Sequence, residues 1–372
     1  MAAEKINIDQ FLKLAQQQTI FDVRSPGEYK HAHMPGAINL PLFTDEERAA
    51  VGTAYKQESR EIAIKMGLDF FGPKMRKMVE EVEGIIGNKQ LAMSKKKNTG
   101  ETNCSLSIAN CLLIYCWRGG MRSAAVAWLL DLYGYKVYIL AGGYKKFRNH
   151  VFDVFKIPFQ FKILGGYTGA GKTEVLKELE KLGEPIVDLE EIANHKGSAF
   201  GNIGLPQQPT LEMFENLLAK ELLIKSSSKA GPHSPIWLED ESQRIGLVNI
   251  PKDLWINMRR SPIYFLDILF EERLNRLVIE YGVLDKQKMI DAIGRIKERL
   301  GGLESKNAIN FLTEGNIAES FRILLKYYDK WYHKGLHNRE GLNSLLQVIN
   351  CDSVTPLNAK KLIQQPEYHE KY

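Results

Sequence analysis

The stretch GYTGAGKT, residues 166–173, constrains the fold of this chain more than any other part of it. It fits the pattern G-x-x-x-x-G-K-[ST] in full, follows the apolar run FKIL and precedes the helical pattern TEVLKELEKLG. Such a loop binds phosphate because a strand and a helix hold its backbone N–H groups in convergence on one point. The stretch therefore predicts an α/β domain with a phosphate-binding loop, or P-loop, whose ligand carries a di- or triphosphate.

The residues of this loop have separate expected roles. Backbone N–H groups from Thr168 to Thr173 should surround a phosphate, Lys172 should reach a terminal phosphate, and Thr173 could bind Mg²⁺. The candidate phosphate-binding residues are Gly166, Thr168, Gly169, Gly171, Lys172 and Thr173. Two further segments, PIVD and PIWLEDE, read as strands whose terminal carboxylates either hold the metal or its water, or face solvent. These carboxylates are Asp188, Glu239, Asp240 and Glu241, and we select Asp240 and Glu241 as candidates.

A second motif, YCWRGGMRS at residues 115–123, delivers a thiol at the end of the apolar run CLLIY. The glycines that follow Cys116 let backbone N–H groups converge, and the two arginines add positive charge. Ser123 is expected to cap the next helix, whose N-terminus adds further positive potential. All of these features stabilise a thiolate, or an oxyanion held beside it. The candidate catalytic residues are Cys116, Arg118, Gly119, Gly120 and Arg122.

Two chemistries use such a loop, and the rest of the first half favours one of them. The spacing Cys-x5-Arg suits a cysteine phosphatase, which also needs a general acid that the sequence does not identify. The segment FDVRSPGEYKHAHMPGAINLPL instead resembles the signatures of the rhodaneses, which carry sulfur on a cysteine as a persulfide. Asp22 and Arg24 fall on the Asp-x-Arg signature as supporting candidates, and LAGG at 140–143 resembles the glycine pair that closes a rhodanese domain.

The chain thus reads as two α/β domains, a rhodanese-like parallel-sheet domain over 1–150 and a P-loop domain over 158–372. The second should have a helical C-terminal part, because the pattern is mostly helical from residue 253 onward. In the first, RSPGEY should be a turn, residues 44–90 helical from a Thr44 cap with Glu47, and about 92–110 a polar loop. A helix is expected from Ser123 to a stop at Gly134, followed by the strand KVYIL.

The composition of the chain limits the cellular compartments in which we expect it. No apolar run approaches the ~20 residues of a membrane span, and the start MAAEKINIDQF has no signal-peptide core, so we expect a cytoplasmic chain without a membrane partner. The four cysteines form neither a disulfide framework nor paired C-x-x-C metal spacing, and no chemistry is assigned to Cys104, Cys111 or Cys351. The net charge is +5, and residues 1–150 hold 21 Lys and Arg against 15 Asp and Glu, which could attract a polyanion.

Six segments spread over both halves of the chain belong together: YCWRGGMRS, VGTAYKQ, GGYTGAGKT, HKGSAFG, EDESQRIG and YYDKWY. Through these segments the two halves resemble one family, the tRNA 2-selenouridine synthases. It implies a transferase that replaces the sulfur of wobble 2-thiouridine in tRNA with selenium from selenophosphate, through an S-geranyl intermediate made from geranyl diphosphate. The P-loop would hold the diphosphate, with Mg²⁺ assisting, and the Cys116 loop would activate the selenium donor, covalently or by stabilising an anion. Both donors are substrates, and no tightly bound cofactor is expected.

Several residues could contact the tRNA or line the site. Arg259, Arg260, Arg295 and Arg299 could meet phosphates, or could form a solvated face. Tyr327, Tyr328, Trp331 and Tyr332 could stack on a base, or could be core residues. The resemblance also suggests that His195, Lys196, Ser198 and Phe200 line the site. The alternatives to this function are a P-loop kinase or NTPase linked to a sulfurtransferase domain, the cysteine phosphatase, and a non-enzymatic tRNA-binding or persulfide-carrying adaptor.

Overall fold

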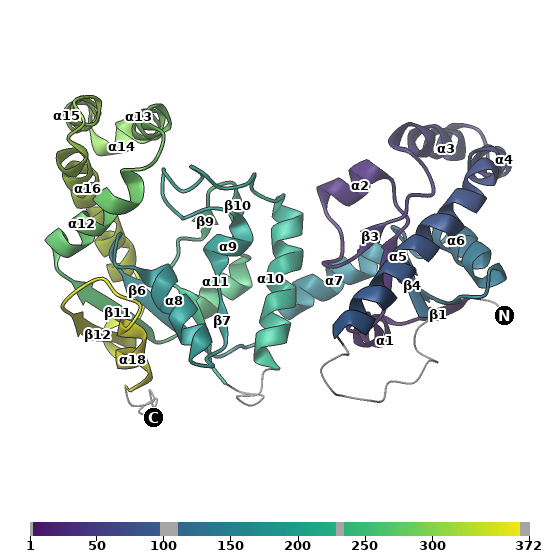
Figure 1. The fold of residues 1–372 in the computed structure, drawn as a ribbon, viewed down its shortest axis with the longest axis horizontal. Coiled ribbons are helices and arrows are strands. Elements are labelled where there is room, and N and C mark those ends of the chain that lie inside the picture. The colour runs from purple at the N-terminus through teal and green to yellow at the C-terminus, as the bar shows by residue number, and fades with distance from the viewer. Residues whose placement is uncertain (1–2, 97–110, 228–233, 365–372) are drawn as a thin grey trace. The chain divides into compact units, whose positions relative to one another are not determined.

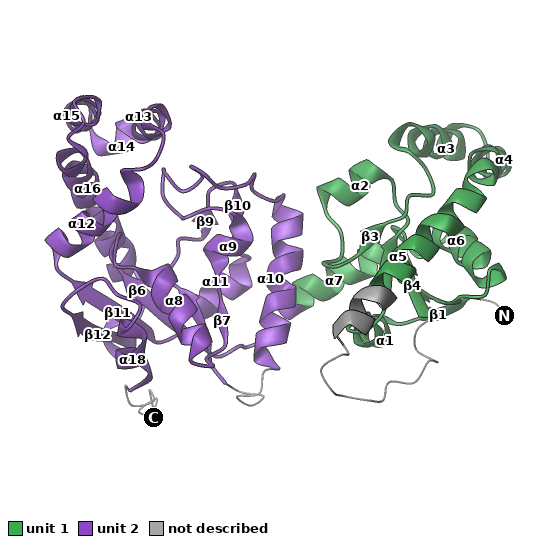
Figure 2. Ribbon diagram, in the orientation of Figure 1, with its two compact units in different colours: residues 1–153 green, residues 154–372 purple. Residues whose placement is uncertain are grey.

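The computed structural model describes residues 3–96, 111–227 and 234–364 of the chain. The chain divides into two compact units, residues 1–153 and residues 154–372 (Figures 1 and 2). Each unit is built on a five-stranded, wholly parallel sheet with helices around it. The predicted α/β fold class is therefore confirmed for both halves.

The sheet of unit 1 has the strand order β1-β5-β4-β2-β3. Its strands are β1 (Glu4–Ile6), β2 (Thr19–Asp22), β3 (Ile38–Asn39), β4 (Cys111–Tyr115) and β5 (Lys136–Leu140). The middle strand β4 pairs with β2 on one side and β5 on the other, and Leu112, Leu113 and Ile114 are fully buried. This burial on both faces explains why its sequence is a continuous apolar run. The strand ends where Cys116 begins the loop of interest.

Helices surround this sheet. They are α1 (Ile8–Ala15), α2 (Pro26–His31), α3 (Asp45–Gln57), α4 (Arg60–Phe71), the 3₁₀ turn η1 (Gly72–Lys74), α5 (Met75–Lys96), α6 (Met121–Leu132) and α7 (Gly143–Val154). The predicted start at Thr44 is confirmed, since its hydroxyl accepts the Glu47 N–H at 3.2 Å while the Glu47 carboxylate accepts the Thr44 N–H. The predicted polar loop is helical up to residue 96, and its remainder, with Cys104, lies outside the described residues.

Two local predictions in unit 1 are wrong. RSPGEY is not a turn but contains the start of α2, where Pro26 occupies the first helical position and the Glu28 carboxylate accepts the Ser25 N–H at 3.3 Å. The helix after the cysteine loop begins at Met121 with Gly120 as its N-cap, so Ser123 lies in the first turn and does not cap it. The Ser123 hydroxyl instead lies within hydrogen-bond distance of two groups, the Gly120 carbonyl oxygen at 3.0 Å and Cys116 Sγ at 3.3 Å.

The sheet of unit 2 has the order β12-β11-β6-β8-β7, and a small antiparallel pair, β9 with β10, lies apart from it. The strands are β6 (Phe161–Gly166), β7 (Ile186–Val187), β8 (Ile236–Glu239), β9 (Arg244–Ile245), β10 (Val248–Asn249), β11 (Ile263–Ile268) and β12 (Leu346–Cys351). The middle strand β6 delivers the P-loop, and its neighbour β8 ends beside it at Glu239. Parallel strands thus bring the loop and an acidic strand end to one edge of the sheet.

The helices of unit 2 include a long C-terminal group. They are α8 (Lys172–Lys181), α9 (Leu189–Ala193), α10 (Leu211–Ser226), α11 (Lys252–Arg259), α12 (Phe270–Tyr281), α13 (Lys286–Arg295), α14 (Lys297–Leu300), α15 (Gly302–Thr313), α16 (Ile317–His337), α17 (Leu342–Leu345) and α18 (Asn358–Ile363). Helices α12 to α16 form a helical part with its own apolar core (Figure 1). The expectation of a mostly helical C-terminal part holds, but it missed strands β11 and β12.

The segment PIVDLEEIA also differs from the prediction. Only Ile186 and Val187 are strand, and Asp188 then caps the short helix α9 by accepting the Glu191 N–H at 2.8 Å. This early turn into a helix places Glu190, rather than Asp188, toward the P-loop, as the site geometry below shows. Across the described ranges of both units, no helix combines the length and apolar character that a membrane crossing requires.

Candidate functional sites

Cys116 directly follows the middle strand of unit 1 and is 3% exposed. Its Sγ lies 3.3 Å from the Ser123 hydroxyl. Burial by itself raises the pKa of the Cys116 thiol, but hydrogen bonds from Ser123, the charge of Arg122 and the Arg118 backbone N–H lower it, and the pKa is below its ordinary value. The loop therefore favours a thiolate, the form of cysteine that attacks an electrophile.

Two glycines fix the shape of this loop. Gly119 and Gly143 have φ values of +63° and +59°, which side chains rarely tolerate. A Cβ on Gly119 would lie 2.4 Å from the Leu140 carbonyl, and one on Gly143 would lie 2.3 Å from the Cys116 carbonyl. The Tyr144 N–H, in the first turn of α7, donates to that same Cys116 carbonyl at 2.8 Å. The cysteine loop and the start of α7 thus pack backbone against backbone, as only glycine permits.

The two arginines of the loop use their charges differently. Arg122 Nη1 donates to Glu28 Oε2 at 2.9 Å, so a residue of α2 already shares its charge. Arg118 is exposed, and it forms no ion pair with any described residue. A Cys-x5-Arg phosphatase would need the Arg122 guanidinium for the phosphoryl oxygens, and the pairing with Glu28 disfavours that alternative.

Asp22 and Arg24 lie inside the fold beside this loop. Arg24 is 1% exposed; its Nε donates to both Asp22 oxygens at 3.0 Å, and its Nη2 donates to Asp22 at 2.6 Å and to the Ala32 carbonyl at 2.7 Å. The guanidinium carbon lies 3.8 Å from the centre of the Tyr144 ring. Because both partners are buried and saturated with hydrogen bonds, they hold the scaffold around Cys116 and do not face solvent.

In unit 2 the P-loop opens into a cavity of 700 Å³, and Thr168 to Thr173 form part of its wall. Gly169 and Gly171 have positive φ values of 83° and 75°, and α8 begins directly afterward at Lys172. The Lys172 ammonium donates to the Gly166 carbonyl at 3.1 Å, so it rests across the loop. The predicted phosphate-binding residues therefore form a continuous loop at a helix N-terminus, the arrangement that binds phosphate.

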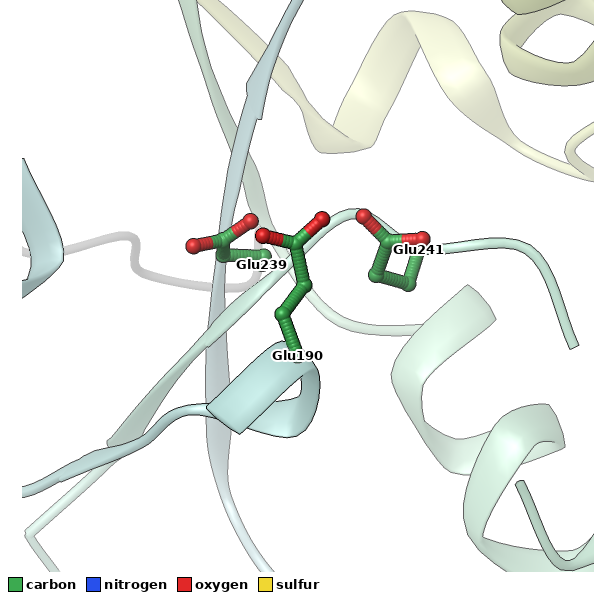
Figure 3. Close-up of side chains that lie close together, drawn as sticks. All are labelled: Glu190, Glu239 and Glu241. Carbon is green, nitrogen blue, oxygen red and sulfur yellow. The ribbon is translucent and has the colours of Figure 1, made fainter. Parts of the chain in front are cut away.

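Three glutamates gather at the mouth of this loop. Glu190 of α9, Glu239 at the end of β8 and Glu241 each place a carboxylate oxygen within 4.8 Å of the others, as Figure 3 shows. The Thr173 hydroxyl donates to Glu190 at 3.3 Å. Burial and the mutual repulsion of the carboxylates raise the pKa of Glu190 and Glu239 to about 8 and that of Glu241 to about 7, against the opposing charge of Lys172. We call these three residues the glutamate cluster.

The glutamate cluster fits a hard divalent cation. Glu239 is 1% exposed, and its Oε1 finds no hydrogen-bond partner among the described residues. Oxygen ligands from several carboxylates and a threonine hydroxyl are what Mg²⁺ prefers. Glu241 and Thr173 were selected from the sequence, whereas Glu190 was missed. Reading Asp188 as a helix cap rather than as strand would have placed Glu190 in a first turn near the P-loop.

Asp240, the other carboxylate selected from the sequence, forms hydrogen bonds outside the glutamate cluster. Its Oδ1 accepts from Arg339 Nη2 at 2.5 Å and its Oδ2 from the Tyr332 hydroxyl at 2.8 Å. The same Tyr332 oxygen accepts the Gly166 N–H at 3.1 Å. Asp240 therefore anchors the base of the P-loop to α16 and is not part of the glutamate cluster.

A second support for the P-loop comes from residues that the sequence did not single out. Arg273 of α12 is 3% exposed and donates to the Thr168 carbonyl at 3.0 Å. It also forms two hydrogen bonds, of 2.9 and 2.8 Å, with the two Asp329 oxygens. Asp329 lies within YYDKWY, so this motif serves at least partly to hold the P-loop in shape.

The residues of the segment HKGSAFG lie in two places, some in the wall of the cavity and others in the protein core. His195 is buried and does not line the cavity, contrary to expectation; its ring fills the space beside Gly201, where a Cβ would lie 2.8 Å from it. Burial and, after it, the charge of Arg295 lower the pKa of the His195 imidazole. Lys196 and Ser198 do line the cavity, while Phe200 belongs to the apolar core of the helical part.

Aromatic and basic side chains also line the cavity. Tyr327, Tyr328, Trp331 and Tyr332 all line it, as do Arg259 and Arg299. Arg260 is exposed elsewhere, and Arg295 donates to the Ala199 carbonyl at 2.7 Å. The cavity thus joins a phosphate loop and an acidic cluster to a wall of aromatic rings.

Both halves of the chain match described protein families. Residues 159–347 match the family described as tRNA 2-selenouridine synthase AAA domain, and residues 7–69 and 80–150 match the Rhodanese-like domain. A relative named tRNA 2-selenouridine synthase, from Bdellovibrio bacteriovorus, is 31% identical over 91% of this chain and 94% of its own. Relatives of the same name from Marinobacter nauticus and Hydrogenovibrio crunogenus are 32% and 34% identical, covering 91% and 86% of this chain and 94% and 90% of theirs.

Proposed function

Because the chain belongs to the tRNA 2-selenouridine synthase family, we propose that it is a tRNA-modifying transferase that forms 2-selenouridine in tRNA. More finely, we propose that it acts on wobble 2-thiouridine in two steps, S-geranylation from geranyl diphosphate and then exchange of sulfur for selenium from selenophosphate. The observation that carries this division is the presence of two unlike anion sites in one chain, a stabilised thiol in unit 1 and an aromatic-walled P-loop cavity in unit 2.

The first step suits the cavity of unit 2. The P-loop N–H groups and Lys172 would bind the diphosphate, and the wall containing Tyr327 and Trp331 would accept the apolar prenyl chain. The thiocarbonyl sulfur attacks C1 of the geranyl group, the C1–O bond breaks, and diphosphate leaves with the electron pair, while N3 of the base loses its proton. The cations of the loop stabilise the charge that develops on this leaving group.

A divalent cation fits this step. Thr173, Glu190, Glu239 and Glu241 would hold Mg²⁺, which would supply positive charge to the departing diphosphate. The chain's own contribution is to keep these carboxylates together in a buried place and to hold Lys172 across the P-loop, where its charge acts on all three of them.

The second step suits the loop of unit 1. Alkylation converts the sulfur into a better leaving group, so selenium can add at C2 and geranyl thiol can leave when the C2–S bond breaks. The Cys116 loop would hold the selenophosphate oxyanion with its N–H groups and Arg118. The Cys116 thiolate would attack phosphorus, and the Se–P bond would break so that selenide leaves to add at C2. Water would then cleave the S–P bond and release phosphate from Cys116. The glycine clamp keeps these donors fixed before the substrate arrives.

The test is mass spectrometry of nucleosides from 2-thiouridine tRNA treated with the full-length protein. Geranyl diphosphate is added first and selenophosphate second. A geranylated nucleoside that converts to 2-selenouridine supports both steps. If the tRNA stays unchanged while ATP is hydrolysed, the proposal fails and the P-loop kinase or NTPase becomes the leading interpretation.

A further inference from the structure

One exposed aromatic ring beside Cys116 has no role in the chemistry above. Trp117 is 39% exposed although its chain neighbour Cys116 is 3% exposed. Met121, at the start of α6, is 52% exposed. The loop therefore exposes apolar side chains to solvent next to its reactive sulfur. Apolar side chains in such a place would ordinarily be buried in the core.

The Trp117 ring rests on a rigid support. The buried Tyr144 ring has its centre 5.7 Å from that of Trp117, and the Arg24 guanidinium carbon lies 3.8 Å from the Tyr144 ring centre and 5.9 Å from that of Trp117. Asp22 in turn fixes Arg24 through two oxygens. A ring held in this way needs little further ordering to accept a flat partner, so binding loses less conformational entropy.

Three exposed cations lie near Trp117 along the backbone. Arg118 follows it directly, and Lys145 and Lys146 lie in the first turn of α7; none of the three forms an ion pair with another residue in the described ranges. The Lys145 N–H also donates to the Trp117 carbonyl at 3.0 Å, so the start of α7 and the tryptophan are joined through the backbone. An aromatic face bordered by unpaired cations is the pattern that binds single-stranded nucleic acid, with bases stacked and phosphates paired.

We propose that Trp117 is a stacking platform for a nucleobase of the tRNA anticodon loop, and that the Asp22–Arg24–Tyr144 stack positions it beside Cys116. The inference rests on tRNA as the substrate under the proposed function, but not on either donor. Stacking a base on Trp117 would hold the strand so that the modified base reaches the cysteine loop. Trp117 is thus a positioning residue, and the buried Asp22 and Arg24 act through it.

The experiment measures binding of an anticodon stem-loop RNA with unmodified uridine at the wobble position. Full-length wild type is compared with Trp117→Ala, Trp117→Phe and the control Trp128→Ala, which removes a ring of α6 that is 53% exposed, more than Trp117. Stacking of a base on an aromatic ring contributes enough binding free energy that the dissociation constant should rise about tenfold for Trp117→Ala. It should stay near the wild-type value for the other two variants. Quenching of tryptophan fluorescence by the RNA should be largely lost in Trp117→Ala and Trp117→Phe alone.

The outcomes separate the platform from the proposed function. If wild type binds and modifies tRNA while Trp117→Ala binds the stem-loop equally well, the platform is overturned and the proposed function stands. If Trp117→Ala loses affinity only for an S-geranylated stem-loop, the ring holds the prenyl group, which also overturns base stacking. If wild type binds the RNA with Trp117-dependent quenching but forms no selenouridine, the platform stands and the proposed function fails. Absence of any RNA binding overturns both.

Discussion

The two units place a glycine-rich loop at the same point of the same kind of sheet. β4 is the middle strand of one five-stranded parallel sheet and β6 of the other, and each runs into a loop followed by a helix. Beside each loop, a buried arginine is bonded to an aspartate and lies over an aromatic ring. The two sets are Arg24 with Asp22 and Tyr144, and Arg273 with Asp329 and Tyr167. Both units therefore use the same backbone arrangement to hold an anion, a glycine-rich loop between a middle strand and a helix.

The electrostatics of the two loops are opposite. In unit 1 the surroundings lower the pKa of the Cys116 thiol, so the site favours its own anion. In unit 2 burial and repulsion raise the pKa of the glutamate cluster, so its carboxylates tend to keep their protons until a cation arrives. The same topology can therefore position a nucleophile in one unit and a binding site for a leaving group in the other. The side chains at the ends of the strands determine which of the two a unit contains.

The sharpest test of this division is Cys116→Ser. We expect selenation of pre-geranylated tRNA to fall by at least about a thousandfold, because a serine hydroxyl stays protonated where the thiol ionises. Geranylation should remain within about twofold of wild type, since the site assigned to it lies in unit 2. Mass spectrometry of the two nucleoside products, measured in separate assays, gives both rates.

Cys351→Ser is the control for this variant, because Cys351 is a buried cysteine of the other unit with a raised pKa. It should leave both rates unchanged. Equal loss of geranylation and selenation in Cys116→Ser would mean that the two loops do not act separately.

The reciprocal change is Lys172→Ala. Removing a charge-assisted contact of about 1.5–3 kcal/mol should weaken geranyl diphosphate binding roughly 10- to 100-fold, and geranylation with it. Selenation of pre-geranylated tRNA should be retained. Isothermal titration calorimetry measures the first effect and nucleoside mass spectrometry the second.

Lys177→Ala provides the matched control, since Lys177 lines the same cavity from α8 but its side chain is 55% exposed. Its removal should change the dissociation constant less than that of Lys172. If the two variants bind the diphosphate equally well, Lys172 does not contact it, and the P-loop loses its assignment as the donor site.

The sequence predicts those structural features of the two units that depend on neighbouring residues in the chain. The apolar runs before Cys116 and Lys172 identify middle strands, because a strand buried on both faces needs apolar side chains throughout. It does not predict where α6 begins, since Gly120 caps the helix without any side-chain signal. Strand β12 is missed for a similar reason, because an edge strand with partly exposed residues such as Val348 carries a weak pattern.

The site divides in the same way. Cys116, Lys172 and Thr173 could be selected because a short motif ties their chemistry to their neighbours in sequence. Arg273 and Asp329 are 56 residues apart and meet only through the packing of α12 on α16. No local pattern reports such a pair, so tertiary structure was needed to find what supports the P-loop.

The glutamate cluster predicts an unusual pH dependence of stability. Glu239 has a folded-state pKa of about 8, above its ordinary value near 4.5, so between these values the folded chain binds a proton that the unfolded chain has lost. Stability of unit 2 should therefore fall as pH rises from about 5 to 8, lowering Tm by about 5 °C without divalent ions. Added Mg²⁺ should reverse much of the loss. Calorimetry at several pH values measures it.

Glu239→Gln should weaken this dependence, with Glu190 and Glu241 still titrating, and should reduce the stabilisation by Mg²⁺, because the amide neither titrates nor supplies a charged ligand. Glu191→Gln, which changes an exposed carboxylate on the same helix as Glu190, should behave like wild type. A wild-type Tm that rises with pH over this range would contradict the assignment of raised pKa values to the cluster.

The smallest expected effect tests the other side of the comparison. Ser123→Ala removes one of several groups that lower the pKa of Cys116, so the thiolate fraction at pH 7 and the rate of alkylation by iodoacetamide should fall about two- to tenfold. Peptide mass spectrometry follows Cys116, with Cys111 and Cys351 as internal references whose pKa burial raises. An unchanged rate would mean that Arg122 and the backbone N–H groups of residues 118 and 123 stabilise the sulfur without the Ser123 hydroxyl. A much larger fall would mean instead that Ser123 holds the loop itself, because one hydrogen bond to a thiolate cannot account for it.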